Sequence, residues 1–369
     1  MVLSRRRLGY ALLWSLVALV VAGILAYISS AEVRYLAQSA WEEARILRTA
    51  RPITDVVQDS TTPARTRAQL ELVLAARDYA ARLGFRAGDT YTTYSDVGRD
   101  TLLLVLSAAP RNCLCPYTWH YPIVGRIPYK GFFDPAMAQA AAASLSAQGY
   151  DVNLRPSGAF STLGWFQDPL LSTALTRDSV ELAATVFHEI AHNTLWVPSA
   201  AAFNESFAQF AGYHAAAEFF RSRGDSVAAQ RALDRWHDEM VLGRYYDQLV
   251  SRLESLYAMN LDSAAVDSGR AAAAEWALQQ LEGPVGADLR TYRIGRLTAH
   301  PINNAQLIGV RLYRTRLDLF DRWYEEHGED IRRSVADLKT ALGDVSGDSA
   351  FVRLGIAVAR SQNADAPGS

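Results

Sequence analysis

The stretch V-E-L-A-A-T-V-F-H-E-I-A-H-N, Val180 to Asn193, carries the strongest structural signal in the chain. Its apolar residues recur at helical spacing, which predicts a helix with one buried face. The larger of these apolar residues are Leu182, Val186 and Ile190. Asp178 lies two residues before the stretch, and Glu181 follows Asp178 by three residues. This spacing is the pattern of a capping box at a helix start. We therefore expect a buried helix over residues 178–195.

Within this stretch, His188 and His192 form an H-E-x-x-H motif with Glu189. Four residues turn a helix by one full turn plus about 40°, so both imidazoles project to one side. Imidazole nitrogens bind zinc at about 2.0–2.1 Å, so this pair predicts a site for one zinc ion. Glu189 lies about 100° away around the axis, where it can take a proton from water without binding the metal. The alternative is a pair of structural histidines, which would need several hydrogen-bond partners in a buried helix.

A catalytic zinc ion takes three protein ligands and leaves one position for water, so a third ligand is needed. The downstream candidates are Glu205, His214 and Glu218. Glu205 is favoured because Asn204 is expected to cap the start of a helix, which puts Glu205 in its first turn. Small residues further along that helix, Gly212 among them, would let it approach the motif helix closely.

Several segments together resemble the Putative aminopeptidase family of bacterial envelope proteins. They are H-E-I-A-H, A-F-N-E-S-F-A, S-T-L-G-W-F-Q-D-P-L-L, T-A-R-P-I, P-I-V-G-R-I-P-Y-K-G-F-F and I-N-N-A, and they extend from about Tyr35 to Leu342. The resemblance implies a gluzincin site, with His188, His192 and Glu205 as zinc ligands and Glu189 as general base.

The chain departs from this family at Arg126, where members carry a Cys, and it lacks a Cys for lipid attachment. It also lacks the G-x-M-E-N segment with which other gluzincin aminopeptidases hold a free amino terminus. Removal of amino-terminal residues therefore does not follow from the resemblance.

Amide hydrolysis also needs a hydrogen-bond donor for the negative oxygen that forms on the carbonyl. In gluzincins a Tyr or His from a later helix donates this bond. Tyr313, on the helix that follows I-N-N-A, is the first candidate, and Tyr245, Tyr246 and His300 are the alternatives. A core aromatic with a satisfied hydroxyl is the competing interpretation of Tyr313.

The N-terminus contains an uncharged apolar run from Leu8 to Ser29, preceded by basic residues at Arg5 to Arg7. About 20 helical residues cross a bilayer, and basic residues keep the preceding end in the cytoplasm. We therefore expect a single-pass anchor in the inner membrane, with the catalytic domain on the periplasmic side. Ser29-Ser30-Ala31 resembles a signal cleavage site, so a cleaved signal is the alternative.

The composition limits the partners. Half of the 369 residues are apolar and the formal charge is −2, so no overall field favours nucleic acid. The only two cysteines, Cys113 and Cys115, are separated by one residue, and two sulfurs do not make a zinc site. They are either paired in an oxidising compartment or incidental.

The order of patterns along the chain predicts an α+β fold. We expect an anchor or signal over residues 1–31, a metallopeptidase domain over 32–342, and a partly ordered tail over 343–369. The domain would have a mixed lobe at about 32–175 and a helical lobe at about 176–342. One long helix is expected over 303–327, and residues 161–166 are a candidate edge strand for pairing with a peptide.

These patterns predict a zinc metallopeptidase that hydrolyses peptide or protein substrates. The alternative is a membrane-tethered zinc protein that binds peptides without cleaving them. Glu189 argues against this alternative, since a purely structural zinc site needs no base and prefers four protein ligands.

Overall fold

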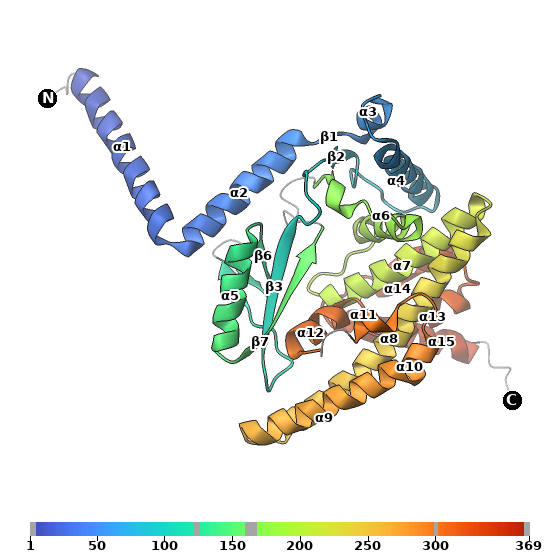
Figure 1. The fold of residues 1–369 in the computed structure, drawn as a ribbon. Coiled ribbons are helices and arrows are strands. Elements are labelled where there is room, and N and C mark those ends of the chain that lie inside the picture. The colour runs from blue at the N-terminus through green and yellow to red at the C-terminus, as the bar shows by residue number, and fades with distance from the viewer. Residues whose placement is uncertain (1–4, 122–124, 159–167, 299–301, 365–369) are drawn as a thin grey trace.

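The structure is a computed structural model that describes residues 5–121, 125–158, 168–298 and 302–364. Helices dominate these residues, and the strands lie between Arg51 and Leu171. Figure 1 shows the two N-terminal helices, the mixed region with its sheet, and the larger helical region that follows. The predicted α+β class is confirmed.

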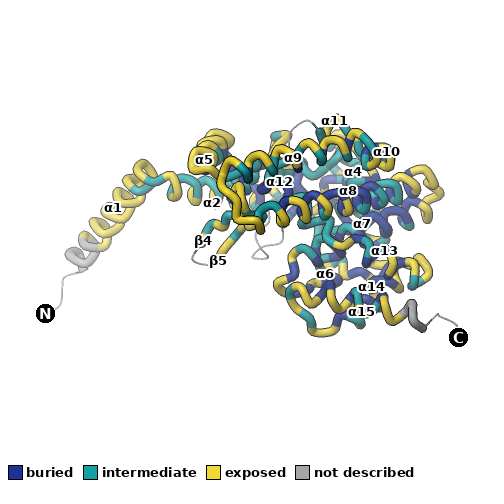
Figure 2. The backbone as a smooth tube through the Cα atoms, turned by 90° about the horizontal axis from the view of Figure 1, so that it is seen from below, coloured by how far each residue is buried: buried dark blue, intermediate teal, exposed yellow. Residues whose placement is uncertain are grey.

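The first helix, α1 (Arg5–Ser29), projects away from the rest of the molecule. Its segment Leu12–Ser29 is long and apolar enough to cross a membrane, and none of it is buried against other elements. Figure 2 shows this exposure along the helix. A helix of this length and composition at an N-terminus fits a membrane span or a signal sequence.

The second helix, α2 (Ala31–Thr49), runs from α1 onto the mixed region. Lys130 Nζ lies 2.8 Å from Glu32 Oε2 and 3.9 Å from the ring centroid of Tyr35. Ile46, near the end of α2, is only 3% exposed in the core. Contacts at both ends therefore fix α2 to the folded region.

The mixed region is built around an antiparallel sheet with the strand order β6-β3-β7. Its strands are β3 (Leu103–Pro110), β6 (Lys130–Phe132) and β7 (Tyr150–Ser157). In its register Leu106 of β3 is opposite Lys130 of β6 and Leu154 of β7. One face of the sheet packs against α5 (Pro135–Ala147).

Two smaller sheets complete this region. One has the order β1-β2-β8, and the other pairs β4 with β5. Their strands are β1 (Arg51–Pro52), β2 (Thr93–Ser95), β8 (Leu170–Leu171), β4 (Trp119–Tyr121) and β5 (Gly125–Ile127). Strand β8 leads through the turn η1 (Ser172–Ala174) to the start of the motif helix.

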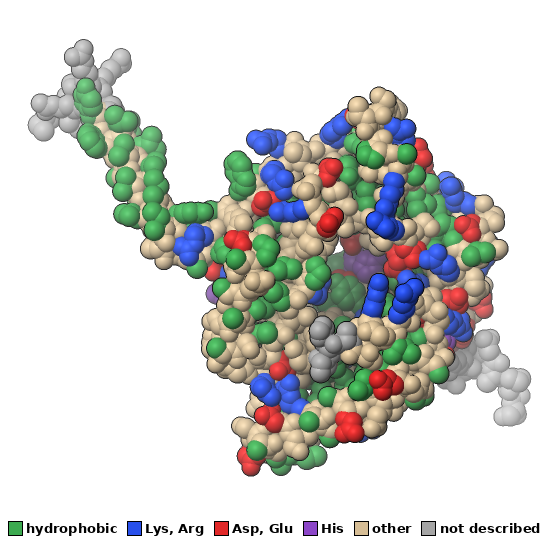
Figure 3. Space-filling model, in the orientation of Figure 1, with side chains coloured by type: hydrophobic (Ala, Val, Ile, Leu, Met, Phe, Trp, Pro, Cys, Tyr) green, Lys and Arg blue, Asp and Glu red, His purple; other side chains and the backbone are tan. Residues whose placement is uncertain are grey.

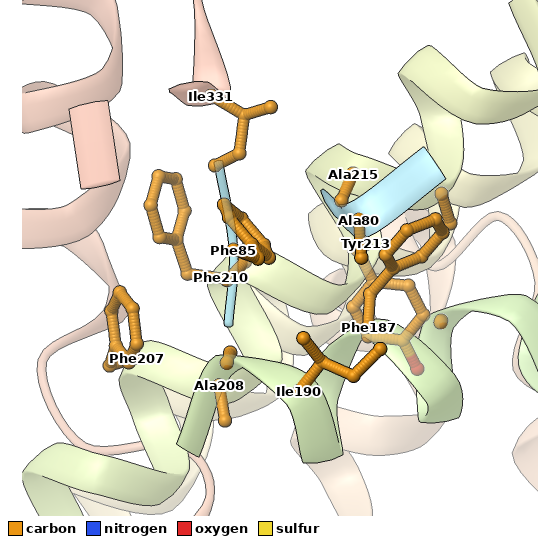
Figure 4. Packing of buried hydrophobic residues seen from close by; sticks show 14 of the residues in the cluster. Ala80, Phe85, Phe187, Ile190, Phe207, Ala208, Phe210, Tyr213, Ala215 and Ile331 are labelled. Atoms are coloured by element: carbon orange, nitrogen blue, oxygen red, sulfur yellow. The ribbon is translucent and has the colours of Figure 1, made fainter. Parts of the chain in front are cut away.

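The helical region is centred on α6 (Ser179–Thr194), α7 (Ala201–Ser222) and α8 (Ser226–Ala258). Helix α7 packs between α6 and α8, and most of its residues are buried. Figure 4 shows part of the apolar core around α6 and α7, including Phe187, Ile190, Phe207 and Phe210. This core fixes how the motif helix and the next helix lie against each other.

The remaining helices surround this centre. They are α3 (Ile53–Gln58), α4 (Ala64–Arg82), α9 (Ser263–Glu282), α10 (Pro284–Asp288), α11 (Ile294–Leu297), α12 (Asn304–Leu312), α13 (Leu317–Glu326), α14 (Ile331–Leu342) and α15 (Ser349–Ala364). The last of them packs Ala350 and Leu354 into the core, where both are fully buried.

The single helix predicted over 303–327 is wrong, because the chain breaks it into α12 and α13. Residues 313–316 link the two helices, and Arg316 has φ +49°, in the left-handed region. The apolar spacing runs through the break, so the pattern gave no sign of it. Contacts of Arg314 and Thr315 with other helices hold the bend.

Two other expectations concern short segments. Cys113 and Cys115 form a disulfide. The candidate edge strand over 161–166 lies outside the described residues.

Candidate metal centre

Helix α6 begins as its sequence predicts, at Asp178. The Asp178 side chain accepts hydrogen bonds from the backbone N–H groups of Val180 at 3.0 Å and Glu181 at 3.5 Å. Glu181 does not complete a capping box, because its carboxylate lies 2.8 Å from Nε of Arg235 on α8. The helix is therefore capped on its own residues and tied to α8 by an ion pair.

Helix α7 begins earlier than expected, and the predicted cap at Asn204 is wrong. The helix starts at Ala201, so Glu205 lies in its second turn. Asn204 is fully buried, accepts a hydrogen bond from Val197 N at 2.9 Å and donates one to Val197 O at 2.8 Å. The side-chain amide of Asn204 thus satisfies both backbone groups of the buried Val197, and it holds the loop between α6 and α7 in place.

A glycine lets α7 approach α6 closely. A Cβ atom on Gly212 would lie 2.8 Å from the Ala184 carbonyl oxygen and 3.4 Å from Cβ of His188. Glu205 precedes Gly212 by seven residues, about two turns, and so lies on nearly the same face of α7. The close approach at Gly212 therefore helps to bring Glu205 to the motif histidines.

His188, His192 and Glu205 bring their ligand atoms together. The donor atoms lie within 4.8 Å of one another. Nε2 of His188 lies 3.2 Å from Nε2 of His192 and 3.3 Å from Oε2 of Glu205. Nε2 of His192 lies 3.8 Å from Oε1 of Glu205. These residues form a possible metal-binding triad.

The triad fits the geometry that zinc prefers. Tetrahedral ligands at about 2.1 Å from the metal are separated by about 3.4 Å. The two imidazole nitrogens are 3.2 Å apart, Oε2 of Glu205 lies 3.3 Å from His188, and Oε1, the other oxygen of the same carboxylate, lies 3.8 Å from His192. Two imidazoles and one carboxylate are also a donor set that zinc uses in catalytic sites.

The electrostatics of His192 also suit a metal ligand. Burial and, to a smaller extent, the neighbouring His188 lower the pKa of His192 to about 4, against the opposing effect of Glu205. The imidazole is therefore neutral at pH 7, the form that binds a metal. Its ring is held by edge-on contacts with the rings of His188 at 4.8 Å and Trp196 at 5.6 Å.

Glu189 lies beside the triad on α6. Burial raises its pKa, the charge of His188 opposes this, and the negative charges of Glu205 and Asp168 add to it. A raised pKa brings a carboxyl group toward the range of an effective general base. Tyr91, which has φ +54°, lies within electrostatic reach of Glu189. Burial raises the pKa of Tyr91, and the negative charge of Glu189 adds to this effect.

Tyr313 lies at the same site. Its ring centroid is 6.3 Å from that of His188. Burial raises the pKa of Tyr313 to about 12, with a further contribution from Glu205, so the hydroxyl keeps its proton at pH 7. Tyr313 is the C-cap of α12, at the break before α13, and not within a continuous helix as expected.

The alternative candidates lie elsewhere. The His214 ring stacks near Tyr324 at 4.0 Å in the core, where burial lowers its pKa to about 3. Glu218 accepts a hydrogen bond from Ile331 N at 3.3 Å. Tyr245 donates to the Ala277 carbonyl at 3.3 Å. Tyr245 and Tyr246 both belong to a separate apolar cluster between α8 and α9. His300 lies outside the described residues.

The sequence analysis missed one residue at the site, Trp196. It is 58% exposed although its ring lies against His192, a metal-ligand candidate. The signal was available, since Trp196 follows His192 by four residues. Figure 3 shows a hollow in one face of the molecule with histidine side chains deep inside it.

Comparison with known proteins gives one match. The family model described as Putative aminopeptidase matches residues 34–347. No curated protein and no solved structure matches the chain.

Proposed function

Because the chain belongs to the Putative aminopeptidase family, we propose that it is a zinc peptidase of the gluzincin type that works in the bacterial cell envelope. The substrate is a peptide or protein, and the reaction is hydrolysis of its amide bonds. The proposal makes His188, His192 and Glu205 the zinc ligands and Glu189 the general base.

One observation carries this proposal, the convergence of three possible ligand atoms from two helices near Glu189, a carboxyl group outside that set. The donor atoms of the triad lie within 4.8 Å of one another. A structural zinc site has four protein ligands, whereas the described residues offer three here, a number that leaves one coordination position for water. The pairing of an incomplete ligand set with Glu189 favours catalysis over a structural role.

His188, His192 and Glu205 would hold a zinc ion that would supply a Lewis acid for the substrate carbonyl and for water. Glu189 takes the proton from the attacking water and passes it to the leaving amine. Its burial and the nearby negative charges raise its pKa, which favours its proton-carrying form in the second step.

The other residues of the site bind and orient the substrate. Tyr313, protonated at pH 7, donates a hydrogen bond to the carbonyl oxygen as that oxygen becomes negative. The exposed face of Trp196 contacts an apolar part of the peptide at the rim of the site. Both residues lie against the triad, since each has a ring contact with one of its histidines.

A peptide library tests the activity directly. The full-length protein, purified in detergent and loaded with zinc, is incubated with pairs of peptides that differ only in a free or acetylated amino terminus. We expect cleavage that is lost after removal of the metal with a chelator and restored by zinc, as measured by mass spectrometry. Cleavage of only the free member of each pair identifies trimming from the amino terminus. A zinc-loaded protein that cleaves no peptide would contradict the proposal.

We also propose that α1 is retained as an inner-membrane anchor, with the residues after it on the periplasmic side. The uncharged run in α1 fits a bilayer, and its preceding arginines favour a cytoplasmic N-terminus. A reporter that works only outside the cytoplasm, fused after residue 40, should be active. Activity of a cytoplasmic reporter alone, fused at the same position, would reverse the orientation.

A further inference from the structure

The Tyr313 side chain is carried by a segment that is neither helix nor strand. α12 ends at Leu312 and α13 begins at Leu317, so residues 313–316 lack a regular backbone hydrogen-bond ladder. Arg316 turns the chain with φ +49°. The segment is tied back to α12 by hydrogen bonds from Arg314 N and Thr315 Oγ1 to the Arg311 carbonyl, both at 2.9 Å. Contacts with other elements hold its remaining side, and these also bear on the direction of the Tyr313 side chain.

The first contact is a buried ion pair between Arg314 and Glu239 of α8. Nε of Arg314 lies 2.7 Å from Oε2 of Glu239, and Nη2 donates to Oε1 at 3.1 Å. The Glu239 side chain is 1% exposed and that of Arg314 is 14% exposed. The Nη2–Oε1 contact is a hydrogen bond, whereas the Nε–Oε2 contact is a close charge contact without hydrogen-bond geometry. A charge-assisted bond together with a second charge contact holds the guanidinium in one orientation against the carboxylate.

The Glu239 carboxylate is also held by the loop between α10 and α11. The Tyr292 hydroxyl donates to Oε1 of Glu239 at 2.6 Å. The neighbouring Asp238 is fully buried and accepts bonds from the backbone N–H groups of Arg290, Thr291 and Tyr292. The carboxylate that pairs with Arg314 therefore has a second partner, and its neighbour Asp238 is anchored to the backbone of residues 290–292.

Two further contacts hold the segment against α7 and α8. Thr315 N donates to Oγ of Ser206 at 3.1 Å, and Ser206 directly follows Glu205 in the chain. On α8, a Cβ atom on Gly243 would lie 3.2 Å from the Arg314 carbonyl oxygen. Arg314 is therefore held against α8, and Thr315 is held against α7, the helix that carries Glu205.

From this arrangement we propose that Glu239 is a positioning residue for the reaction. Through Arg314 it sets where the Tyr313 hydroxyl meets the substrate carbonyl. This inference rests on the proposed function, in which Tyr313 contacts the substrate. Glu239 itself is a buried residue of α8, and in this proposal it does not contact the substrate.

Stability alone does not favour such a pair. Removing two charges from water is expensive, and apolar side chains of similar volume often stabilise a fold as well or better. The pair differs from an apolar contact in fixing the direction of the guanidinium, and with it the adjacent backbone. A donor displaced by about 1 Å can reduce the rate by about 10²-fold, so fixing this direction matters for catalysis.

The first test is a double-mutant cycle with Tyr313→Phe and Glu239→Gln in the full-length, zinc-loaded protein. We expect Tyr313→Phe to lower kcat by roughly 10²–10³-fold and Glu239→Gln by roughly 10–10²-fold, with little change in KM. The double variant should match Tyr313→Phe to within about twofold, because Glu239 acts only through Tyr313. If the two effects multiply, Glu239 acts by another route and the proposal fails.

The second test does not depend on activity. The protein is labelled with 3-fluorotyrosine, and the Tyr313 signal among its 17 tyrosines is the one lost in Tyr313→Phe. We expect Glu239→Gln to shift or broaden this ¹⁹F signal and to leave zinc content unchanged. Arg314→Lys, which keeps the charge but loses the planar guanidinium that contacts both carboxylate oxygens, should do the same and serves if Glu239→Gln does not fold. Arg99→Lys is the matched control, since Arg99 pairs with Glu42 at 2.9 Å on α2.

The two failures are distinguishable. If the wild type cleaves no peptide but the ¹⁹F signal of Tyr313 moves in Glu239→Gln, the positioning contact stands and the peptidase proposal falls. If the signal stays at its wild-type position in Glu239→Gln and in Arg314→Lys, the positioning role is overturned whatever the activity.

Discussion

Replacing Glu189 with Gln should lower turnover by roughly 10²–10⁴-fold, because this carboxylate is the only group assigned to move protons. Gln keeps the size of the side chain and its hydrogen-bonding reach but takes up no proton from water. Glu189 supplies no atom to the possible metal-binding triad, so zinc content should stay at the wild-type level. The measurement is kcat on a cleaved library peptide, with zinc content determined on the same samples.

The matched control for Glu189→Gln is Glu218→Gln. Glu218 also has a pKa raised mainly by burial, but it lies on α7 and accepts a backbone hydrogen bond from Ile331. This variant should cleave at close to the wild-type rate. If Glu189→Gln cleaves as fast as Glu218→Gln, Glu189 is not the base. If neither the wild type nor Glu189→Gln cleaves any peptide and both bind one equally, the chain is a peptide-binding module.

The second large effect is loss of the metal on removal of one ligand. His188→Ala, His192→Ala and Glu205→Ala should each weaken zinc binding by more than the 10–100-fold typical of residues that only support a ligand. The reason is that each variant leaves two protein donors from a set of three. The measurement is zinc per chain after dialysis against a weak competing chelator.

The control for the ligand variants is His120→Ala, since His120 lies on β4 and is exposed. It should retain one zinc per chain. Full zinc occupancy in both His188→Ala and His192→Ala would refute the ligand assignment. Loss of zinc from those two variants but not from Glu205→Ala would refute only the third ligand.

The sequence predicted much of the fold and of the triad for local reasons. The spacing of His188 and His192 places both rings on one face of a helix wherever that helix packs. The small residue at Gly212 indicated a close approach of the next helix, and in the structure a Cβ atom at this position would lie only 2.8 Å from the Ala184 carbonyl oxygen. Glu205 reaches the site because it shares the face of α7 that Gly212 brings against α6.

Other features depend on contacts between distant segments, which a local pattern does not contain. Asn204 looked like a helix cap because Asn is common there, but in the fold it binds both backbone groups of Val197. The break after Leu312 is accompanied by the pairing of Arg314 with Glu239, 75 residues earlier, and by the bond from Thr315 to Ser206 on α7. The apolar spacing across 303–327 is continuous, so it predicted one helix where tertiary contacts require two.

The most direct measurement is anomalous diffraction from crystals of the zinc-loaded full-length protein, recorded on both sides of the zinc absorption edge. The account predicts one strong anomalous peak per chain, about 2.0–2.2 Å from Nε2 of His188, Nε2 of His192 and a carboxylate oxygen of Glu205. The Glu189 carboxylate should lie near this peak without binding the metal. A zinc-loaded crystal with its peak elsewhere, or with Glu189 in place of Glu205 among the ligands, would contradict the account.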